Sequence, residues 1–258
     1  MTPQDTVVAV RDARTRYLIM RSLERMRIPF TVGRFSDSIC QVAKAIITDE
    51  DMTGKDERVI LVKNEGDIEG AVIVTAALLN GVTRGTNAVI GVDPGLRFGL
   101  ALIIDGKVLC TTSAISPAHA VRQTLRWITI IRQNLVHCSV MIRVGGGSRF
   151  FLALYLRALQ RASSRVAVQI VDEHHTTVTS GPDNDRSSAT IIAQREGVAV
   201  TDDRLRLERR EGYIRLLKRL FGQLTGGNRL STDEAEDILA GRRSLDEAIS
   251  AVHCSKND

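Results

Sequence analysis

Carboxylates stand at the ends of apolar, strand-like runs in the second half of the chain. Asp93 follows the run 89–92, and the pair Asp172-Glu173 follows the run 166–171. A third group, Asp183-Asn184-Asp185, comes immediately before a helical pattern. Carboxylate oxygens are hard ligands of the kind that Mg²⁺ or Mn²⁺ prefers. These positions are candidate cation ligands, although Asp-Pro-Gly is also a good turn and acids also favour a helix start through its dipole.

A glycine run, Gly145-Gly146-Gly147-Ser148-Arg149, leads from a strand pattern into a helix pattern. Exposed N–H groups at a helix start favour anions, and the arginine adds positive charge. The run lacks the Gly-Lys-Ser/Thr ending of a Walker loop. It is therefore either a phosphate-contacting loop or a tight strand-to-helix turn.

Strand and helix patterns alternate over residues 1–84. Short apolar runs predict strands at 6–10, 29–32, 46–48 and 59–63, and helical spacing predicts helices at 12–26, 39–45 and 67–79. Such alternation indicates a parallel sheet, so we expect a small flavodoxin-like or receiver-like α/β domain. Asp49-Glu50-Asp51 follows one strand and would be either a cation site or a solvated turn.

The next region begins with three strand patterns in quick succession, at 88–92, 99–104 and 107–112. Asp105-Gly106 lies between the last two and predicts a tight hairpin, because both turn residues tolerate positive φ. Helix, strand, helix, strand and helix patterns follow at 117–133, 139–144, 149–162, 166–171 and 185–196. A meander followed by α/β units predicts a mixed sheet rather than a doubly wound one.

Three ordered motifs in this region resemble the RNase H-like superfamily, specifically the RuvC/YqgF-type (Holliday-junction resolvase-like) domains. Ile90-Gly91-Val92-Asp93-Pro94-Gly95, followed by Phe98-Gly99-Leu100-Ala101, is similar to their first two strands. The segment 171–177, with Asp172-Glu173-His174, resembles the D-E-R-x-[ST]-T segment of the YqgF type, and 185–194 resembles its closing helix. The resemblance implies an α/β fold with an RNase H-like mixed sheet at about 88–198. A flavodoxin-like domain at 1–84 would precede it, and a helical region at 199–258 would follow.

The resemblance implies a metal-dependent nuclease that hydrolyses phosphodiesters of structured DNA or RNA with Mg²⁺ or Mn²⁺. Carried over by position, the catalytic residues would be Asp93, Asp172, Glu173 and Asp185, and the metal ligands Asp93, Glu173, Asp183 and Asp185. The nucleic-acid contacts would be Gly95, Arg97, Gly146, Arg149 and His174. His174 replaces an arginine of the family and would either orient a water or be a plain strand-end residue.

One position departs from the resolvase pattern. Resolvases place a glutamate on the fourth strand, where this chain has Arg143 in or near the corresponding position. The YqgF type also lacks that glutamate. A catalytically degenerate nucleic-acid-binding or scaffolding protein is therefore a second reading. A third is a phosphotransferase or nucleotide hydrolase of the actin-like superfamily, which normally needs two domains with such a hairpin.

The C-terminal region combines an apolar helical stripe with many arginines, and Ser231–Glu234 is a capping box. Its basic helix would contact a phosphate backbone, or pack on its own domain or on a second subunit. The net charge of +5 is compatible with a polyanionic partner, whereas 4% aromatic residues argue against a surface of stacked aromatics.

The remaining composition indicates the compartment. The four cysteines lack C-x-x-C spacing, which indicates reduced thiols rather than a zinc or redox site. The N-terminus lacks a signal pattern, and the longest apolar stretch, 71–79, is too short to span a bilayer. We expect a cytoplasmic protein with DNA or RNA as partner and no membrane association, and a second copy of the chain is a further candidate partner.

Overall fold

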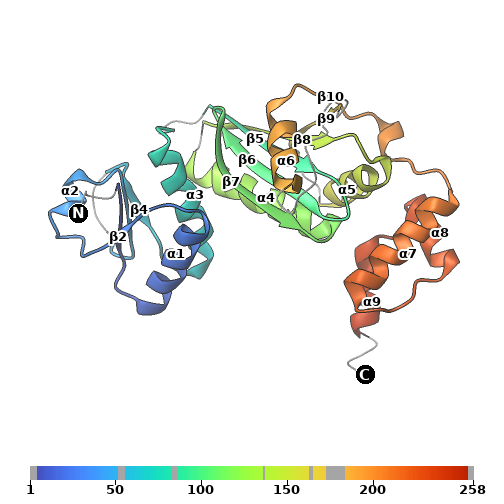
Figure 1. The fold of residues 1–258 in the computed structure, drawn as a ribbon, viewed down its shortest axis with the longest axis horizontal. Helices are drawn as coiled ribbons and strands as arrows, with labels where there is room; N and C mark the ends of the chain where they lie inside the picture. The colour runs from blue at the N-terminus through green and yellow to red at the C-terminus, as the bar shows by residue number, and fades with distance from the viewer. Residues whose placement is uncertain are drawn as a thin grey trace. The chain divides into compact units, whose positions relative to one another are not determined.

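The computed structural model describes residues 5–51, 56–82, 86–135, 137–162, 165–172 and 184–254, with the backbone alone at Asn184, Asp185, His253 and Cys254. The fold is α/β, as predicted (Figure 1). It divides into two compact units. The first comprises 1–88 with 103–110 and 127–139, and the second comprises 89–102, 111–126 and 140–258. The domain boundaries expected near residues 84 and 199 stay a prediction.

A four-stranded parallel sheet forms the centre of the first unit. Its order is β2 (Thr31–Val32), β1 (Thr6–Ala9), β3 (Ala45–Thr48) and β4 (Val59–Leu61). Every residue of β1 and β3 is buried, which matches the continuous apolar runs expected of central parallel strands. The sequence predicted these four strands within a few residues.

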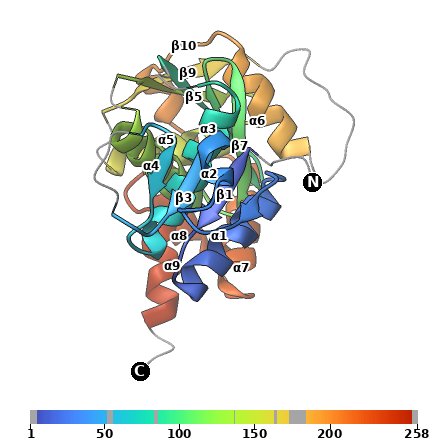
Figure 2. The same ribbon diagram turned by 90° about the vertical axis from the view of Figure 1, so that its left-hand side faces the viewer.

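Helices cover both faces of this sheet (Figure 2). Helix α1 (Ala13–Arg25) packs Ile19 and Leu23 on one face together with α3 (Ile68–Leu79), and α2 (Ile39–Val42) packs Cys40 on the other. The helix predicted at 39–45 is shorter, because Ala45 already pairs with Thr6 in the sheet. Tyr17 of α1 is 59% exposed and does not belong to this core.

Within the first unit, α3 lies against the second half of α4 (Pro117–Asn134). A Cβ on Gly70 would lie 3.7 Å from the side chain of Ile130, so the missing side chain permits a close approach of the two helices. Trp127 is almost fully buried and its indole N–H donates to the Glu69 carboxylate at 3.0 Å. The hydrogen bond satisfies the polar atom of a large buried ring.

A six-stranded sheet has the order β10-β9-β8-β5-β6-β7. Its strands are β5 (Asn87–Asp93), β6 (Phe98–Ile104), β7 (Lys107–Ala114), β8 (Ser139–Gly145), β9 (Ala167–Val171) and β10 (Val198–Ala199). The predicted hairpin is confirmed, because Asp105 and Gly106 have φ of 46° and 78°. Strand β10, which was not predicted, pairs antiparallel with β9 over two residues. Propensity alone does not indicate so short a strand, since it forms only against a neighbour.

Helices α5 (Arg149–Arg161) and α6 (Asn184–Gln194) belong to the second unit. Tyr155 of α5 is fully buried and shares a 3.0 Å hydrogen bond with Thr124 of α4. The C-terminal region forms η2 (Asp202–Leu205), α7 (Glu211–Thr225), α8 (Thr232–Ala240) and α9 (Leu245–Cys254). Its predicted capping box is confirmed by reciprocal hydrogen bonds between Ser231 and Glu234. Among the helices within the described ranges, none is long and apolar enough to cross a membrane.

Candidate functional site

Three strands of the six-stranded sheet end at one edge. Strands β8 and β9 are parallel, and Gly145 is in register with Val171. Strand β5 is the neighbour of β8, and the two strands begin side by side, because the Ser139 N–H donates to the Thr86 carbonyl at 2.9 Å. Both therefore run in the same direction, and their last residues, Asp93 and Gly145, lie at the same edge as Asp172. Two strand spacings separate β5 from β9, or roughly 10 Å between backbones.

Helix α6 lies directly on β5. A Cβ on Gly91 would collide with the carbonyl oxygen of Ala189 and would lie 2.9 Å from the amide nitrogen of Ala193. Alternate residues of a strand share a face, so the half-buried Asp93, two residues beyond Gly91, belongs to the face that α6 covers. Ile90 and Val92 point the other way and are fully buried. Gly91, which the sequence interpretation passed over, thus permits the closing helix to approach the strand that carries Asp93.

Arg143 of β8 is anchored beneath the same helix. Its Nη1 donates to the Ala193 carbonyl at 2.9 Å, and its Nε donates to the side-chain oxygen of Gln169 on β9 at 3.1 Å. Ala193 is in the last turn of α6, where the helix leaves carbonyl groups without intrahelical partners. The arginine therefore supports the C-terminal end of α6.

Asp172 directly follows β9 and is exposed. Its main-chain carbonyl accepts a hydrogen bond from Arg195 Nη1 at 3.4 Å. The adjacent N–H of Gly146 donates to the Val171 carbonyl at 2.9 Å. The glycine run thus ties the end of β8 to the end of β9, and the N–H of Gly146 is already used within the sheet edge.

The other predicted phosphate contacts have local partners of their own. Arg149, the first residue of α5, is exposed and donates to the Asp203 carbonyl of η2 at 3.1 Å. Arg97 is exposed in the turn between β5 and β6. A Cβ on Gly95 would lie 3.1 Å from the Arg97 carbonyl oxygen, so a compact turn explains this glycine without a ligand.

Several predicted residues lie outside what the structure describes. Glu173, His174 and Asp183 are outside the described residues, and Asp185 is described by its backbone alone, as the second residue of α6. Within the described part of the chain, no three histidine, cysteine, aspartate or glutamate side chains gather as metal ligands. The metal set expected from the sequence therefore stays a prediction.

The acidic loop of the first unit has a structural role. The carboxylate of Asp49 accepts hydrogen bonds from the main-chain N–H groups of Arg11, at 2.9 and 3.0 Å, and Asp12, at 2.9 Å. Partial burial opposes ionisation of Asp49, but these donors outweigh it and lower the pKa of the carboxyl group. Glu50 pairs with the Arg11 side chain at 2.9 Å. The loop thus joins the ends of β3 and β1.

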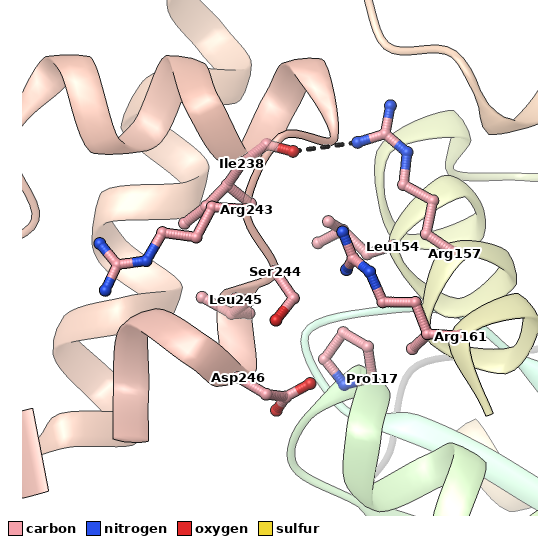
Figure 3. A pocket seen from close by; sticks show the side chains of 10 residues that line it. Pro117, Leu154, Arg157, Arg161, Ile238, Arg243, Ser244, Leu245 and Asp246 are labelled. Carbon is pink, nitrogen blue, oxygen red and sulfur yellow. Dashed lines mark hydrogen bonds between the residues drawn. The ribbon is translucent and has the colours of Figure 1, made fainter. Parts of the chain in front are cut away.

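The C-terminal helices are fixed to α5 by arginines that the sequence interpretation did not single out. Arg157 donates to the carbonyl oxygens of Leu205 at 2.7 Å and Leu239 at 2.9 Å. It also donates to the carbonyl oxygen of Ile238 at 3.0 Å (Figure 3). Partial burial lowers the pKa of its guanidinium. Arg161 adds a 3.2 Å bond to the Gly241 carbonyl. These donors cap the C-terminal end of α8, so the helical tail packs on its own unit.

No protein-family model matches this chain, and neither a curated protein nor a solved structure matches it at a significant level.

Proposed function

We propose that the protein is a metal-dependent nuclease of the RuvC/YqgF type, which hydrolyses phosphodiesters of structured DNA or RNA. The observation that carries the proposal is the position of Asp93. It ends an interior strand of a mixed sheet, on the face covered by the closing helix α6. A meander whose first strand lies between its second strand and the following parallel strand is the arrangement that the RNase H-like resemblance implies.

The proposed carboxylates come from three separate elements. Asp93 ends β5, Asp172 follows β9, and Asp185 is in the first turn of α6. Glu173 and Asp183 complete the proposed set. Their oxygens are suitable donors for Mg²⁺ or Mn²⁺, and such an ion, when bound, polarises the phosphate and lowers the pKa of a bound water. The protein residues would hold and orient the scissile phosphate at this edge.

The test is cleavage of labelled four-way-junction DNA and of hairpin RNA in Mg²⁺ or Mn²⁺. We expect Asp93→Asn to lower the cleavage rate by roughly a hundredfold or more, because a ligand to the reacting centre is lost. Asp233→Asn, which removes an exposed carboxylate on α8, is the matched control and should cleave like the wild type. Undiminished cleavage by a folded Asp93→Asn variant would show that Asp93 is not catalytic.

Arg143 supports a second candidate, a nucleic-acid-binding protein that does not cleave. Its guanidinium is held by Gln169 and Ala193 beneath α6, at the position where resolvases place an anionic ligand. A cation there favours binding of phosphate over binding of a second metal ion. Salt-sensitive binding of nucleic acid without cleavage in Mg²⁺ or Mn²⁺ would favour this candidate.

A further inference from the structure

The exposed side of α1 carries a row of arginines around one aromatic ring. Arg14, Tyr17, Arg21 and Arg25 follow one another at intervals of three or four residues, so they lie on one face of the helix. Their side chains point to solvent: Arg14 is 78% exposed, Arg21 is 67% exposed and Tyr17 is 59% exposed. Arg25 is exposed as well. We call these four residues the α1 row.

The charged residues of this helix and its ends are mostly positive. Residues 11–27 contain six arginines, no lysine and two acids, Asp12 and Glu24. Asp12 is used as the N-cap of α1, where it accepts a hydrogen bond from Thr15 N. Guanidinium groups form paired hydrogen bonds to phosphate and stack on planar groups, which ammonium groups do not. A segment that uses only arginine is therefore suited to a phosphate-bearing polymer.

The ion pairs of the α1 row are exposed and therefore weak. Arg14 pairs with Glu65 at 2.7 Å and Arg21 with Glu24 at 3.7 Å, and in both pairs both side chains are at least half exposed. Pairs of this kind contribute little to stability, so a phosphate can replace the carboxylate at low cost. The Arg25 side chain forms no hydrogen bond or ion pair with any residue that the structure describes.

The other side chains of α1 indicate which kind of molecule binds the α1 row. A membrane-surface helix would need an exposed apolar side, but α1 buries Ile19 and Leu23 against the sheet. Tyr17 is the single large hydrophobic side chain of α1 that is exposed. One accessible ring between guanidinium groups offers a platform on which an unpaired base can stack. From Arg14 to Arg25 the helix rises about 16 Å, enough to follow several nucleotides.

We propose that the α1 row binds single-stranded nucleic acid, with the arginines on the phosphates and Tyr17 stacked on a base. The α1 row shares no residue with the proposed carboxylate site and does not depend on nuclease chemistry there. It gives the first unit, whose acidic loop is engaged internally, a binding function of its own.

The test is fluorescence anisotropy of labelled oligothymidine of about 20 nucleotides with the full-length protein, in EDTA and about 50 mM salt. We expect Arg21→Gln/Arg25→Gln to weaken binding by about tenfold or more and to reduce the salt slope by about 1.4, since two phosphate contacts are lost. Tyr17→Ala should weaken binding about fivefold to a hundredfold. It should affect a blunt duplex of the same length much less, because the bases of a duplex are already stacked.

Arg229→Gln/Arg242→Gln is the matched control, because it removes two exposed arginines that lie outside α1 and outside the basic helix α7. Its affinity should stay within about twofold of wild type. Equal weakening by both double variants, or no effect of Tyr17→Ala, would overturn the proposal. The nuclease proposal is tested separately: Asp93→Asn should keep this binding in EDTA. If the wild type binds through α1 but never cleaves, the nuclease proposal fails and the α1 proposal holds.

Discussion

The guanidinium of Arg143 donates a 2.9 Å hydrogen bond to the main-chain carbonyl of Ala193, and the bare backbone of Gly91 lies against the same residue. Two neighbouring strands thus hold one turn of α6 in two ways, through a long cationic side chain and through the absence of any side chain. The same helix begins with Asn184-Asp185. These contacts in its last turn therefore fix the position of α6 on the sheet.

Replacing Arg143 should lower stability. Arg143→Met keeps the aliphatic stem but removes both donors, so the Ala193 carbonyl and the Gln169 amide lose a partner. We expect the free energy of unfolding to fall by about 1–3 kcal/mol, the usual contribution of hydrogen bonds to a charged group. Urea denaturation measures the change. Arg132→Met, at an exposed position of α4, should stay within about 0.5 kcal/mol of wild type, and equal losses would contradict the structural role.

Adding a single methyl group at Gly91 should displace α6. In Gly91→Ala the new Cβ meets the backbone at Ala189 and Ala193, which cannot rotate away as a side chain would. We expect a loss of about 1–3 kcal/mol or more, together with faster amide exchange in α6. Gly212→Ala is the control, because nothing lies within 4 Å of its Cβ and alanine favours a helix. A variant of Gly91 as stable as wild type would mean that α6 is not seated on β5.

Arg157 should decide whether the C-terminal helices stay docked. Arg157→Met leaves three main-chain carbonyls without their donor in a partly buried place. We expect a loss of about 2–4 kcal/mol and protease cleavage ahead of α7. Arg242→Met breaks one exposed ion pair with Asp237 and should cost less than about 1 kcal/mol. Equal protease resistance of the Arg157 variant and the wild type would argue against this anchor.

The Asp49 carboxylate should make stability depend on pH. Its pKa in the folded protein is below the ordinary value of 3.8, so the unfolded chain binds the proton more readily. The stabilisation is complete above the ordinary value and disappears as pH falls through the folded value. Wild type should therefore exceed Asp49→Asn in stability at pH 6, and the difference should shrink as the pH falls below about 4. Urea denaturation at pH 6 and at a pH below about 4 measures this difference in stability. A difference that does not depend on pH would contradict the lowered pKa of Asp49.

Local patterns predicted most elements because their signals are local. The Asp105-Gly106 turn, the Ser231–Glu234 cap and the alternating strands and helices of the first unit depend on residues close in the chain. Strand β10 and the exposure of Tyr17 could not be predicted in this way. A two-residue strand exists only through its partner β9, and the side of α1 that is buried depends on which helix face meets the sheet.

The candidate site was likewise predictable from the sequence only in part. Motif order alone pointed to Asp93 and to the segments around Asp172 and Asp185, and a glycine inside a strand already signals close backbone approach. The contacts of Gly91, Arg143 and Arg157 could not be predicted in this way. Each of them joins residues that are 26 to 102 positions apart in the sequence.

The sequence by itself determined the kinds of element, their order and the residue types at their ends, because propensity, capping and turn chemistry act over a few residues. Only the tertiary structure decided that β5, β8 and β9 end at one edge, that α6 rests on Gly91 and that the tail packs on α5. These relationships arise when distant segments exclude water together and must satisfy each other's polar groups, and no short stretch of sequence specifies its partner.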